Sequence, residues 1–288
     1  MIPGAFDYHR PSSVADAALL LRQLGEDARL LAGGHSLIPL MKTRLATPDH
    51  LIDLSGVGGL KGVRRSEEVF VIGAMTTEHE LIQSEQLAEA VPILREAAAT
   101  IADPQVRYRG TIGGNVANGD PGNDMPAVMQ CLDARYVLVG PGGQREVAAR
   151  AFYRGAYDTA LAPGEILTEI RITAPPPGHG FAYEKLKRRI GDYATAAAAV
   201  VLTMSGGRCA SASVALTNVA DTPLWAEEAA AILAGSDLGK ATLERAAAAA
   251  EAITSPASDL HGPAEYRVKM AGVMLRRAVM RALSRARA

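Results

Sequence analysis

Cysteine is scarce in this chain, since only Cys131 and Cys209 occur among its 288 residues. A [2Fe–2S] cluster normally takes four thiolates in close spacings, so this chain does not hold an iron–sulfur cluster by itself. Both cysteines stand in apolar stretches of sequence. We therefore expect two buried free thiols rather than a disulfide, as is usual for a cytosolic protein.

An excess of charge of one sign and a long apolar run are also missing. The net charge is −1 at pH 7, so no bulk electrostatic attraction to nucleic acid or to an anionic membrane is expected. No uninterrupted apolar run approaches the roughly 18 residues of a membrane span. The N-terminus lacks the basic and apolar regions of a secretion signal. These absences predict a cytoplasmic protein without a nucleic-acid partner.

Common catalytic and metal-binding motifs are absent as well. The run GVGGLKG at 56–62 has Lys61 where a dinucleotide-binding fingerprint needs its third glycine, and HELIQ at 79–83 lacks the second histidine of a zinc-binding helix. No serine lies in a G-x-S-x-G turn. His35, beside two glycines, is expected to line a ligand or to pack locally rather than to act as a base. The sequence thus predicts neither a catalytic residue nor a metal ligand.

Glycine, by contrast, is plentiful, and two similar turns concentrate it. LLAGGHSLIPLMK at 30–42 and TIGGNVANGDPGND at 111–124 each contain two adjacent glycines followed by polar residues. Adjacent glycines let successive N–H groups point into one anion-binding nest, and two such nests can grip a pyrophosphate from both sides. Ser36, Thr111 and Asn115 add uncharged hydrogen-bonding groups. The alternative is that both runs are simply tight turns.

Two carboxylates follow the second glycine turn. Asp120 and Asp124 stand among proline, glycine and asparagine, a composition that is typical of turns. The alternative function for Asp124 is to accept hydrogen bonds from the sugar-like hydroxyl groups of a ligand.

The order of the expected elements divides the chain into two domains. Residues 1–55 predict a small β/α lobe and residues 56–177 a larger α/β lobe of the first domain. Three consecutive prolines at 175–177 fix an extended backbone that cannot join a sheet interior, so we place the boundary near residue 177. Residues 178–288 predict an α+β domain with a three-stranded antiparallel sheet and helices. The expected strands are 28–34, 50–55, 68–75, 135–143 with its hairpin turn, 165–172, 181–188, 194–205 and 209–219, and the expected helices are 11–25, 77–90, 91–102, 124–134, 222–234, 239–253 and 264–286.

Three stretches carry a resemblance to a known family. AGGHS at 32–36, TIGGN at 111–115 and YEKLKRRIGDYATAAAAV at 183–200 resemble the FAD-binding medium subunits of molybdenum hydroxylases, within the flavoprotein class that includes vanillyl-alcohol oxidase. The resemblance extends over residues 2–279 and is strongest to the medium subunits of aerobic, molybdenum- and copper-containing carbon monoxide dehydrogenases. It implies a two-lobed FAD-binding domain of the vanillyl-alcohol oxidase type. The α+β domain that follows would cover the flavin and contact partner subunits.

The resemblance also implies which residues bind FAD. The two glycine turns would hold the pyrophosphate, Asp124 the sugar-like chain, and Lys185 and Tyr193 would lie beside and over the isoalloxazine ring. From the residues alone, Lys185 can equally be a solvated strand position, and Tyr193 can pack at an interface between lobes. The implied set is Ala32, Gly33, Gly34, His35, Ser36, Leu37, Ile101, Thr111, Ile112, Gly113, Gly114, Asn115, Asp124, Leu161, Lys185 and Tyr193.

The implied function is electron transfer within a complex. A large subunit with a molybdenum–copper cofactor would oxidise carbon monoxide, and a small subunit with two [2Fe–2S] clusters would relay electrons to the FAD of this chain. The FAD would pass them to a quinone-type acceptor, so no substrate bond is broken here, which agrees with the missing acid–base residues. A dimer of heterotrimers is implied, with peripheral association of the complex at the inner face of the cell membrane.

Three alternatives remain from the sequence. The complex could oxidise xanthine or an N-heterocycle, because the residues that choose the substrate lie on another subunit. A stand-alone flavin reductase or oxidase would need polar substrate anchors, and the sequence shows none. A nucleotide-binding module without redox chemistry would use the same glycine turns. The arginines of residues 264–286 form either a solvated helix face or a surface for another subunit.

Overall fold

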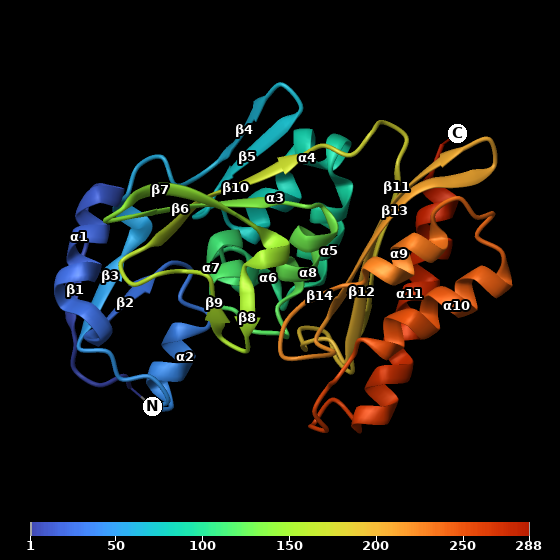
Figure 1. The fold of residues 1–288 in the computed structure, drawn as a ribbon. Coiled ribbons are helices and arrows are strands. Elements are labelled where there is room, and N and C mark those ends of the chain that lie inside the picture. The colour runs from blue at the N-terminus through green and yellow to red at the C-terminus, as the bar shows by residue number, and fades with distance from the viewer. Residues whose placement is uncertain (1, 288) are drawn as a thin grey trace.

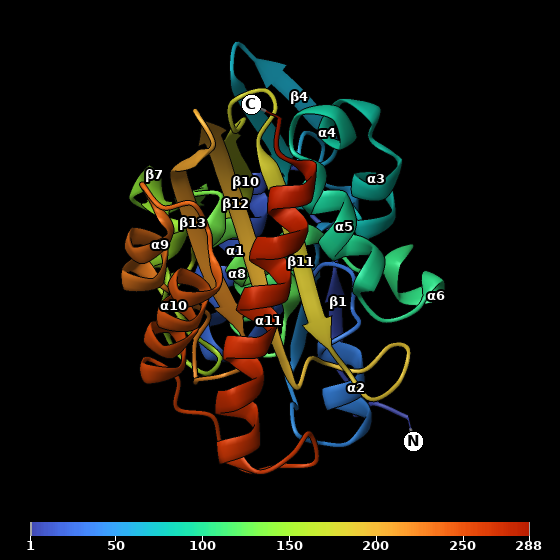
Figure 2. The ribbon, with the colours of Figure 1, turned by 90° about the vertical axis from the view of Figure 1, so that its right-hand side faces the viewer.

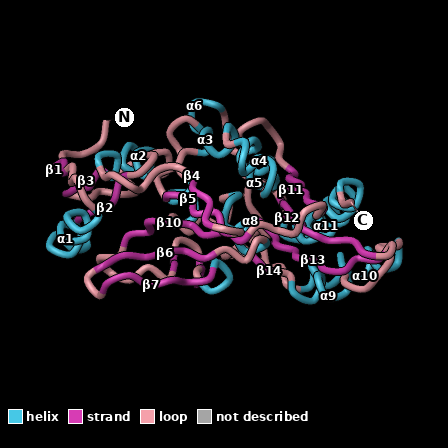
Figure 3. Tube along the Cα trace, turned by 90° about the horizontal axis from the view of Figure 1, so that it is seen from above, coloured by secondary structure: helices cyan, strands magenta, loops and turns pink. Residues whose placement is uncertain are grey.

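The computed structural model describes residues 2–287 and builds them around three main β-sheets (Figure 1). The sheets follow one another from the N-terminal lobe at the left of the view to the C-terminal lobe at the right, and the view from above in Figure 3 shows the same order. The mixed helix and sheet architecture expected from the sequence is confirmed. Within this described range, every helix is too short or too polar to cross a bilayer.

The N-terminal lobe is a small parallel sheet in the strand order β1-β3-β2. Its elements are β1 (Asp7–His9), α1 (Val14–Leu24), β2 (Ala28–Leu31), α2 (Leu37–Lys42) and β3 (His50–Asp53). Ser13 begins α1 by accepting a hydrogen bond from the N–H of Asp16 at 3.0 Å. Strand β2 is shorter than the expected 28–34, because the backbone leaves the sheet after Leu31 to form the first glycine turn.

The second sheet is antiparallel, in the order β4-β5-β10-β6-β7. Its strands are β4 (Val63–Ser66), β5 (Val69–Gly73), β6 (Arg135–Gly140), β7 (Gly143–Ala148) and β10 (Ile166–Thr173). Ile170 and Ile172 of the central strand β10 are fully buried with Phe70 and Ile72 of β5. This apolar face forms the largest core of the described residues, and helices α7 and α8, which carry Asn115 and Asp124, pack against it.

Short helices and one small hairpin cover this core. They are α3 (Glu78–Gln83), α4 (Glu85–Ala90), α5 (Pro92–Thr100), α6 (Pro104–Arg107), α7 (Ile112–Ala117), α8 (Asp124–Cys131), β8 (Tyr153–Gly155) and β9 (Asp158–Thr159). The helix expected over 77–90 is two helices, because Ser84 ends α3 and also caps α4 through the N–H of Leu87 at 3.4 Å. The second glycine turn, expected as a loop, is the first turn of α7.

The C-terminal part is a four-stranded antiparallel sheet with three helices. Its elements are β11 (Gly180–Leu186), β12 (Ala196–Ser205), β13 (Arg208–Thr217), β14 (Leu224–Trp225), α9 (Glu227–Leu233), α10 (Lys240–Ala252) and α11 (Ala264–Arg285). The three expected strands are present, and the two-residue strand β14 is added at the edge. Figure 2 shows α11 lying along the sheet beside β11 and β12.

Strand β12 is buried on both faces. Ala197 and Ala199 contribute to the core of the middle lobe, whereas Ala198 and Val200 contribute to a separate core beneath α10 and α11. Because successive side chains of a strand point to opposite faces, the alanine-rich run can pack closely against helices on either side. The sheet therefore joins the middle lobe to the C-terminal helices, and Tyr183 of β11 points toward the middle lobe.

Candidate functional site

The first glycine turn, Ala32–Leu37, joins β2 to α2 and leaves its backbone donors free. Gly34 adopts a φ of +79°, which glycine takes without strain, and its carbonyl accepts the N–H of Ile38 at 3.0 Å. Among residues 2–287, no acceptor pairs with the N–H groups of residues 33–37. His35 is exposed, and Ser36 is half-buried with no capping bond from its hydroxyl group. The turn thus offers successive N–H groups to an anionic ligand.

The second glycine turn differs from a nest of free N–H groups. Ile112 donates to the carbonyl of Thr76 at 2.9 Å, Gly113 to that of Ala74 at 2.8 Å and Asn115 to that of Thr111 at 2.9 Å. Gly114 donates to Oγ1 of Thr111 at 3.1 Å, so Thr111 caps α7. The expectation that this turn grips a pyrophosphate with free backbone donors is therefore wrong, because these N–H groups are used inside the protein.

The two turns nevertheless lie against each other, and their glycines make the contact possible. A Cβ on Gly33 would lie 2.3 Å from the carbonyl oxygen of Arg109 and 2.8 Å from Cα of Gly110. A Cβ on Gly114 would lie 3.6 Å from Cβ of Ala32. Residues eighty positions apart thus meet through backbone surfaces that have no room for a side chain. The second turn supports the first, which carries the free donors.

A buried ion pair lies between α8 and β11. Nζ of Lys185 is 2.7 Å from Oδ2 of Asp124, and the two side chains are 3% and 4% exposed. The hydroxyl of Tyr183 donates to Oδ1 of the same carboxylate. Burial, together with the Asp124 charge, raises the pKa of Tyr183, so the phenol remains a donor. The structure therefore brings the predicted residues Asp124 and Lys185 together and adds Tyr183, which the sequence analysis missed.

Tyr193 follows β11 and lies over the turn that precedes α8. It is 45% exposed, and a Cβ on Gly122 would lie 3.0 Å from Cδ1 of its ring. Asp120 lies nearby, and the hydroxyl of Tyr157 donates to its Oδ2 at 3.1 Å. Burial first, and then the Asp120 charge, raises the pKa of Tyr193. The Asp120 carboxylate therefore binds Tyr157 and acts through its charge on Tyr193, the residue expected to cover the flavin.

Ile101 and Leu161 complete the predicted set. Ile101 is buried at the end of α5 and its carbonyl accepts Nη1 of Arg107 at 2.7 Å. Leu161, just after β9, is half-buried against the same core. Both supply apolar surface and neither offers a polar side-chain atom. They can line a ligand but cannot orient it by hydrogen bonding.

Two buried polar groups near the second turn have no partner within the described residues. They are Oδ1 of Asn115 and both carboxylate oxygens of Glu78. An unpaired buried polar atom costs free energy, so such atoms indicate a place for a ligand or for water. Together with the free N–H groups of residues 33–37, they fit a ligand such as FAD, which carries phosphate, hydroxyl and ring oxygen atoms.

Glu78, Tyr183 and Tyr157 were not predicted as site residues, for different reasons. Tyr183 lies two residues before Lys185, so strand alternation could have placed both on one face. Glu78 follows the N-cap Thr77 of a short helix, where an acidic residue is ordinary. Tyr157 is 37 positions from Asp120, and no local pattern links the two.

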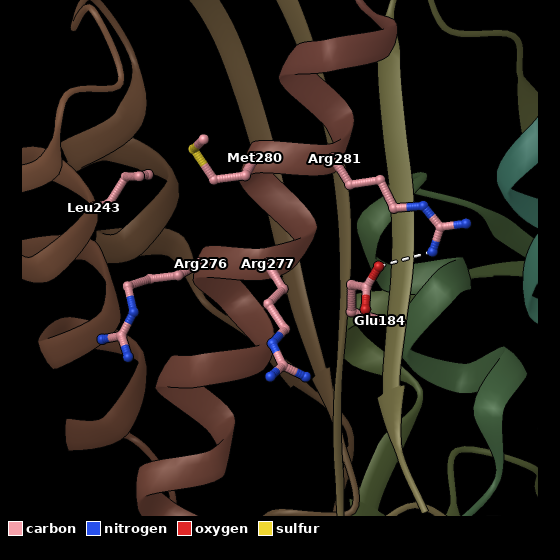
Figure 4. Close-up of a pocket in the computed structure, with 6 residues that line it drawn as sticks. All are labelled: Glu184, Leu243, Arg276, Arg277, Met280 and Arg281. Carbon is pink, nitrogen blue, oxygen red and sulfur yellow. Dashed lines mark hydrogen bonds and ion pairs between the residues drawn. The ribbon is translucent and has the colours of Figure 1, made fainter.

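A groove on the C-terminal helix α11 lies away from these residues (Figure 4). It measures about 540 Å³ and is lined by Glu184, Leu243, Arg276, Arg277, Met280 and Arg281. Arg281 donates to Glu184 at 2.7 Å, whereas Arg276 and Arg277 point along the helix surface. None of the sixteen predicted cofactor residues lines it.

In residues 2–287 no cluster of histidine, cysteine and acidic side chains is arranged to hold a metal ion, and Cys131 and Cys209 are buried free thiols.

Two family models match almost the whole chain. The FAD binding domain in molybdopterin dehydrogenase matches residues 4–175, and the carbon monoxide dehydrogenase flavoprotein C-terminal domain matches residues 181–282. The chain belongs to the molybdopterin dehydrogenase FAD-binding family. The resemblance read from the glycine turns and from residues 183–200 is thereby confirmed, and with it FAD as the cofactor and an oxidoreductase complex as the setting.

Several members of the family are similar to this chain over their full length. The carbon monoxide dehydrogenase medium chain of Afipia carboxidovorans is 70% identical, with 100% of each chain covered. A chain of the crystal structure of a Cu,Mo-CO dehydrogenase in a cyanide-inactivated form is 70% identical with a TM-score of 0.99, covering 99% of this chain and 100% of that one. A chain of quinoline 2-oxidoreductase from Pseudomonas putida 86 is 35% identical with a TM-score of 0.93, covering 99% of each.

Proposed function

We propose that this family member holds FAD with its diphosphate on the first glycine turn. The observation that carries the proposal is the run of unpaired N–H groups at residues 33–37. Asp124 would accept hydrogen bonds from the ribityl hydroxyls, and Thr111 and Asn115 would add polar contacts beside the diphosphate. Ala32 and Leu37 flank the turn, and the second glycine turn gives it a rigid support.

Lys185, Tyr193, Ile101 and Leu161 would surround the ring. Nζ of Lys185 already neutralises Asp124, and its positive charge would stabilise added electron density at the nearby ring edge. Tyr193, half-exposed and close to the Asp120 charge, would cover one face of the ring and exclude water. Ile101 and Leu161 would supply apolar walls.

We also propose residues 1–177 as the FAD-binding domain and residues 178–288 as the domain that closes over the flavin.

The bound FAD would accept electrons one at a time and pass them on as a pair. Its electrons would come from partner subunits. We propose a small subunit with two [2Fe–2S] clusters and a large subunit with a molybdenum–copper cofactor, assembled as a dimer of heterotrimers. The overall reaction would be CO + H₂O + quinone → CO₂ + quinol, in the cytoplasm, at the inner face of the cell membrane.

Carbon monoxide is favoured over other substrates by the degree of similarity. Identity is 70% and 51% to carbon monoxide dehydrogenase medium chains, but 37%, 34% and 33% to subunits of a 6-hydroxypseudooxynicotine, a glyceraldehyde and a caffeine dehydrogenase. An N-heterocycle is the second candidate, because the quinoline enzyme shares the fold.

The test uses this chain purified with the subunits that it captures in its native host. We expect extracted FAD, iron and molybdenum, and bleaching of the flavin absorption under carbon monoxide. Bleaching by quinoline or xanthine but not by carbon monoxide would move the assignment to the second candidate. Flavin reduced directly by a small organic molecule in the isolated chain would overturn the electron-transfer function.

A further inference from the structure

Glu78, the first residue of α3, is the most deeply buried carboxyl group without a partner in the described chain. Its side chain is 1% exposed, and neither Oε1 nor Oε2 has a hydrogen-bond partner among residues 2–287. Most buried polar groups in folded proteins are paired. A carboxyl group left in this condition lowers the stability of the chain by itself, so its position beside the glycine turns indicates a place for a partner, either a ligand or water.

Helix α3 does not need this carboxyl group for its own start. The hydroxyl of Thr77 caps the helix by accepting a hydrogen bond from the N–H of Glu80. The carboxylate of Glu80 in turn accepts a hydrogen bond from the N–H of Thr77 at 2.9 Å. The capping box is therefore complete without Glu78. Glu80 also pairs with Lys61 at 2.9 Å and is partly exposed. The two carboxyl groups of one helix thus have separate surroundings, one satisfied and one not.

Glu78 lies directly behind the second glycine turn. Its N–H donates to the carbonyl of Gly110 at 2.9 Å, and a Cβ on Gly110 would be 3.9 Å from Cγ of Glu78. Gly110 is also the residue whose Cα approaches Gly33. Thr77 forms an isolated antiparallel bridge with Thr111. The carboxyl group is therefore adjacent to the point where the two glycine turns meet.

The surroundings keep Glu78 protonated. Burial, with a smaller contribution from the Asp124 carboxylate, raises the pKa of Glu78 from its ordinary 4.5 to about 8. Asp124 is itself neutralised by Lys185 and accepts a hydrogen bond from Tyr183 of β11, and among residues 2–287 no basic side chain is bonded to the Glu78 carboxyl group. At neutral pH the group is mainly a neutral carboxylic acid, which can donate one hydrogen bond to an acceptor oxygen.

We propose that Glu78 is a further FAD-contacting residue, which donates a hydrogen bond from its protonated carboxyl group to an oxygen atom of the bound cofactor. This inference rests on the proposed FAD site. The bond would satisfy the orphaned carboxyl group and would tie α3 to the cofactor from behind the second glycine turn. FAD binding would then recover the free energy that burial of Glu78 costs the empty chain.

The experiment compares FAD affinity with the stability of the FAD-free full-length chain. Glu78→Leu removes the polar group, Glu78→Gln keeps its size and a donor, and Glu80→Gln is the matched control on the same helix, since glutamine preserves a capping box. We expect Glu78→Leu to raise the Kd for FAD about tenfold while raising the urea midpoint of the FAD-free chain. Glu78→Gln should recover part of the affinity, and Glu80→Gln should bind FAD as the wild type does.

Infrared difference spectra give a second readout that does not depend on the leucine variant folding. In the wild type, FAD binding should shift the C=O stretch of a protonated carboxylic acid. The shift should be absent in Glu78→Gln and present in Glu80→Gln. Wild-type affinity in Glu78→Leu, or no carboxylic acid shift on FAD binding, would overturn the proposal. Failure of the wild-type chain to bind FAD at all would instead overturn the proposed function.

Discussion

Nζ of Lys185 on β11 lies 2.7 Å from Oδ2 of Asp124 at the start of α8, and both side chains are almost fully buried. The pair connects the C-terminal sheet to the middle lobe, because α8 packs on β12 and β13. Tyr183, two residues from Lys185, donates to the second oxygen of the same carboxylate. One carboxylate thus connects α8 to β11 at the position where Asp124 and Lys185 were expected to meet a flavin.

Removing one member of this pair should destabilise the chain. Asp124→Asn leaves the Lys185 charge buried without a counter-ion, and breaking a buried pair in this way costs about 3–5 kcal/mol. The free energy of unfolding in urea measures the loss. The double variant Asp124→Asn, Lys185→Met should recover much of it, because no unpaired charge remains. A double variant as unstable as Asp124→Asn alone would show that the pair is not the cause.

A methyl group at the contact between the glycine turns should disturb both stability and FAD retention. In Gly33→Ala the new Cβ would meet the Arg109 carbonyl at 2.3 Å, so the two turns must separate, at a cost of about 1–3 kcal/mol. Gly58→Ala is the control, since no atom lies within 4 Å of its Cβ and its φ is not positive. FAD content after gel filtration should fall in the first variant only. Equal FAD content in both variants would contradict the contact described here.

Tyr193 should control access to the flavin rather than its binding. Tyr193→Ala is expected to keep most FAD but to change the rate of flavin reoxidation, because the ring loses its cover. Asp120→Asn should also change this rate, since it removes a charge that acts on the Tyr193 phenol. Stopped-flow absorption measures both. Unchanged rates in the two variants would return Tyr193 to a packing role.

The protonation of Glu78 should appear in the pH dependence of stability. The folded chain keeps this proton up to about pH 8, whereas the unfolded chain loses it near 4.5. Between these values the folded state binds more protons than the unfolded state. The contribution of Glu78 to the free energy of unfolding is therefore fully present below pH 4.5 and is lost as pH rises through 8. The wild type should therefore lose a few kcal/mol of stability, as an order of magnitude, relative to Glu78→Gln as pH rises over this range.

Urea unfolding of the FAD-free chain at successive pH values measures this difference. Asp124, whose charge acts on Glu78, and its partners Lys185 and Tyr183 are the same in both chains, so their own contributions cancel. A stability difference that is independent of pH would mean that Glu78 ionises normally in the folded chain.

Local sequence signals were sufficient for much of the fold. The serine cap of α1, the alternation of β10 and the proline run before β11 each act within a few residues, so the expected elements at these places are present. The break between α3 and α4 at Ser84 was missed because a serine within an apolar periodic pattern is also compatible with a continuous helix. The two-residue strand β14 depends on a neighbour provided by β13.

The site was predictable in its location but not in its hydrogen bonding. Repeated glycines indicated two turns that serve one ligand, and the structure brings these turns together. Which turn keeps its N–H groups free depends on Ala74 and Thr76, which lie over thirty positions before the second turn. The orphaned state of Glu78 likewise arises from packing between distant helices, which no local pattern records.

The most direct test of this account is the position of the diphosphate in a crystal structure of this chain with FAD. We predict diphosphate oxygens within hydrogen-bonding distance of the N–H groups of residues 33–37, with the isoalloxazine ring between Lys185 and Tyr193. A diphosphate bound elsewhere, with the N–H groups of residues 33–37 still free, would contradict the central claim.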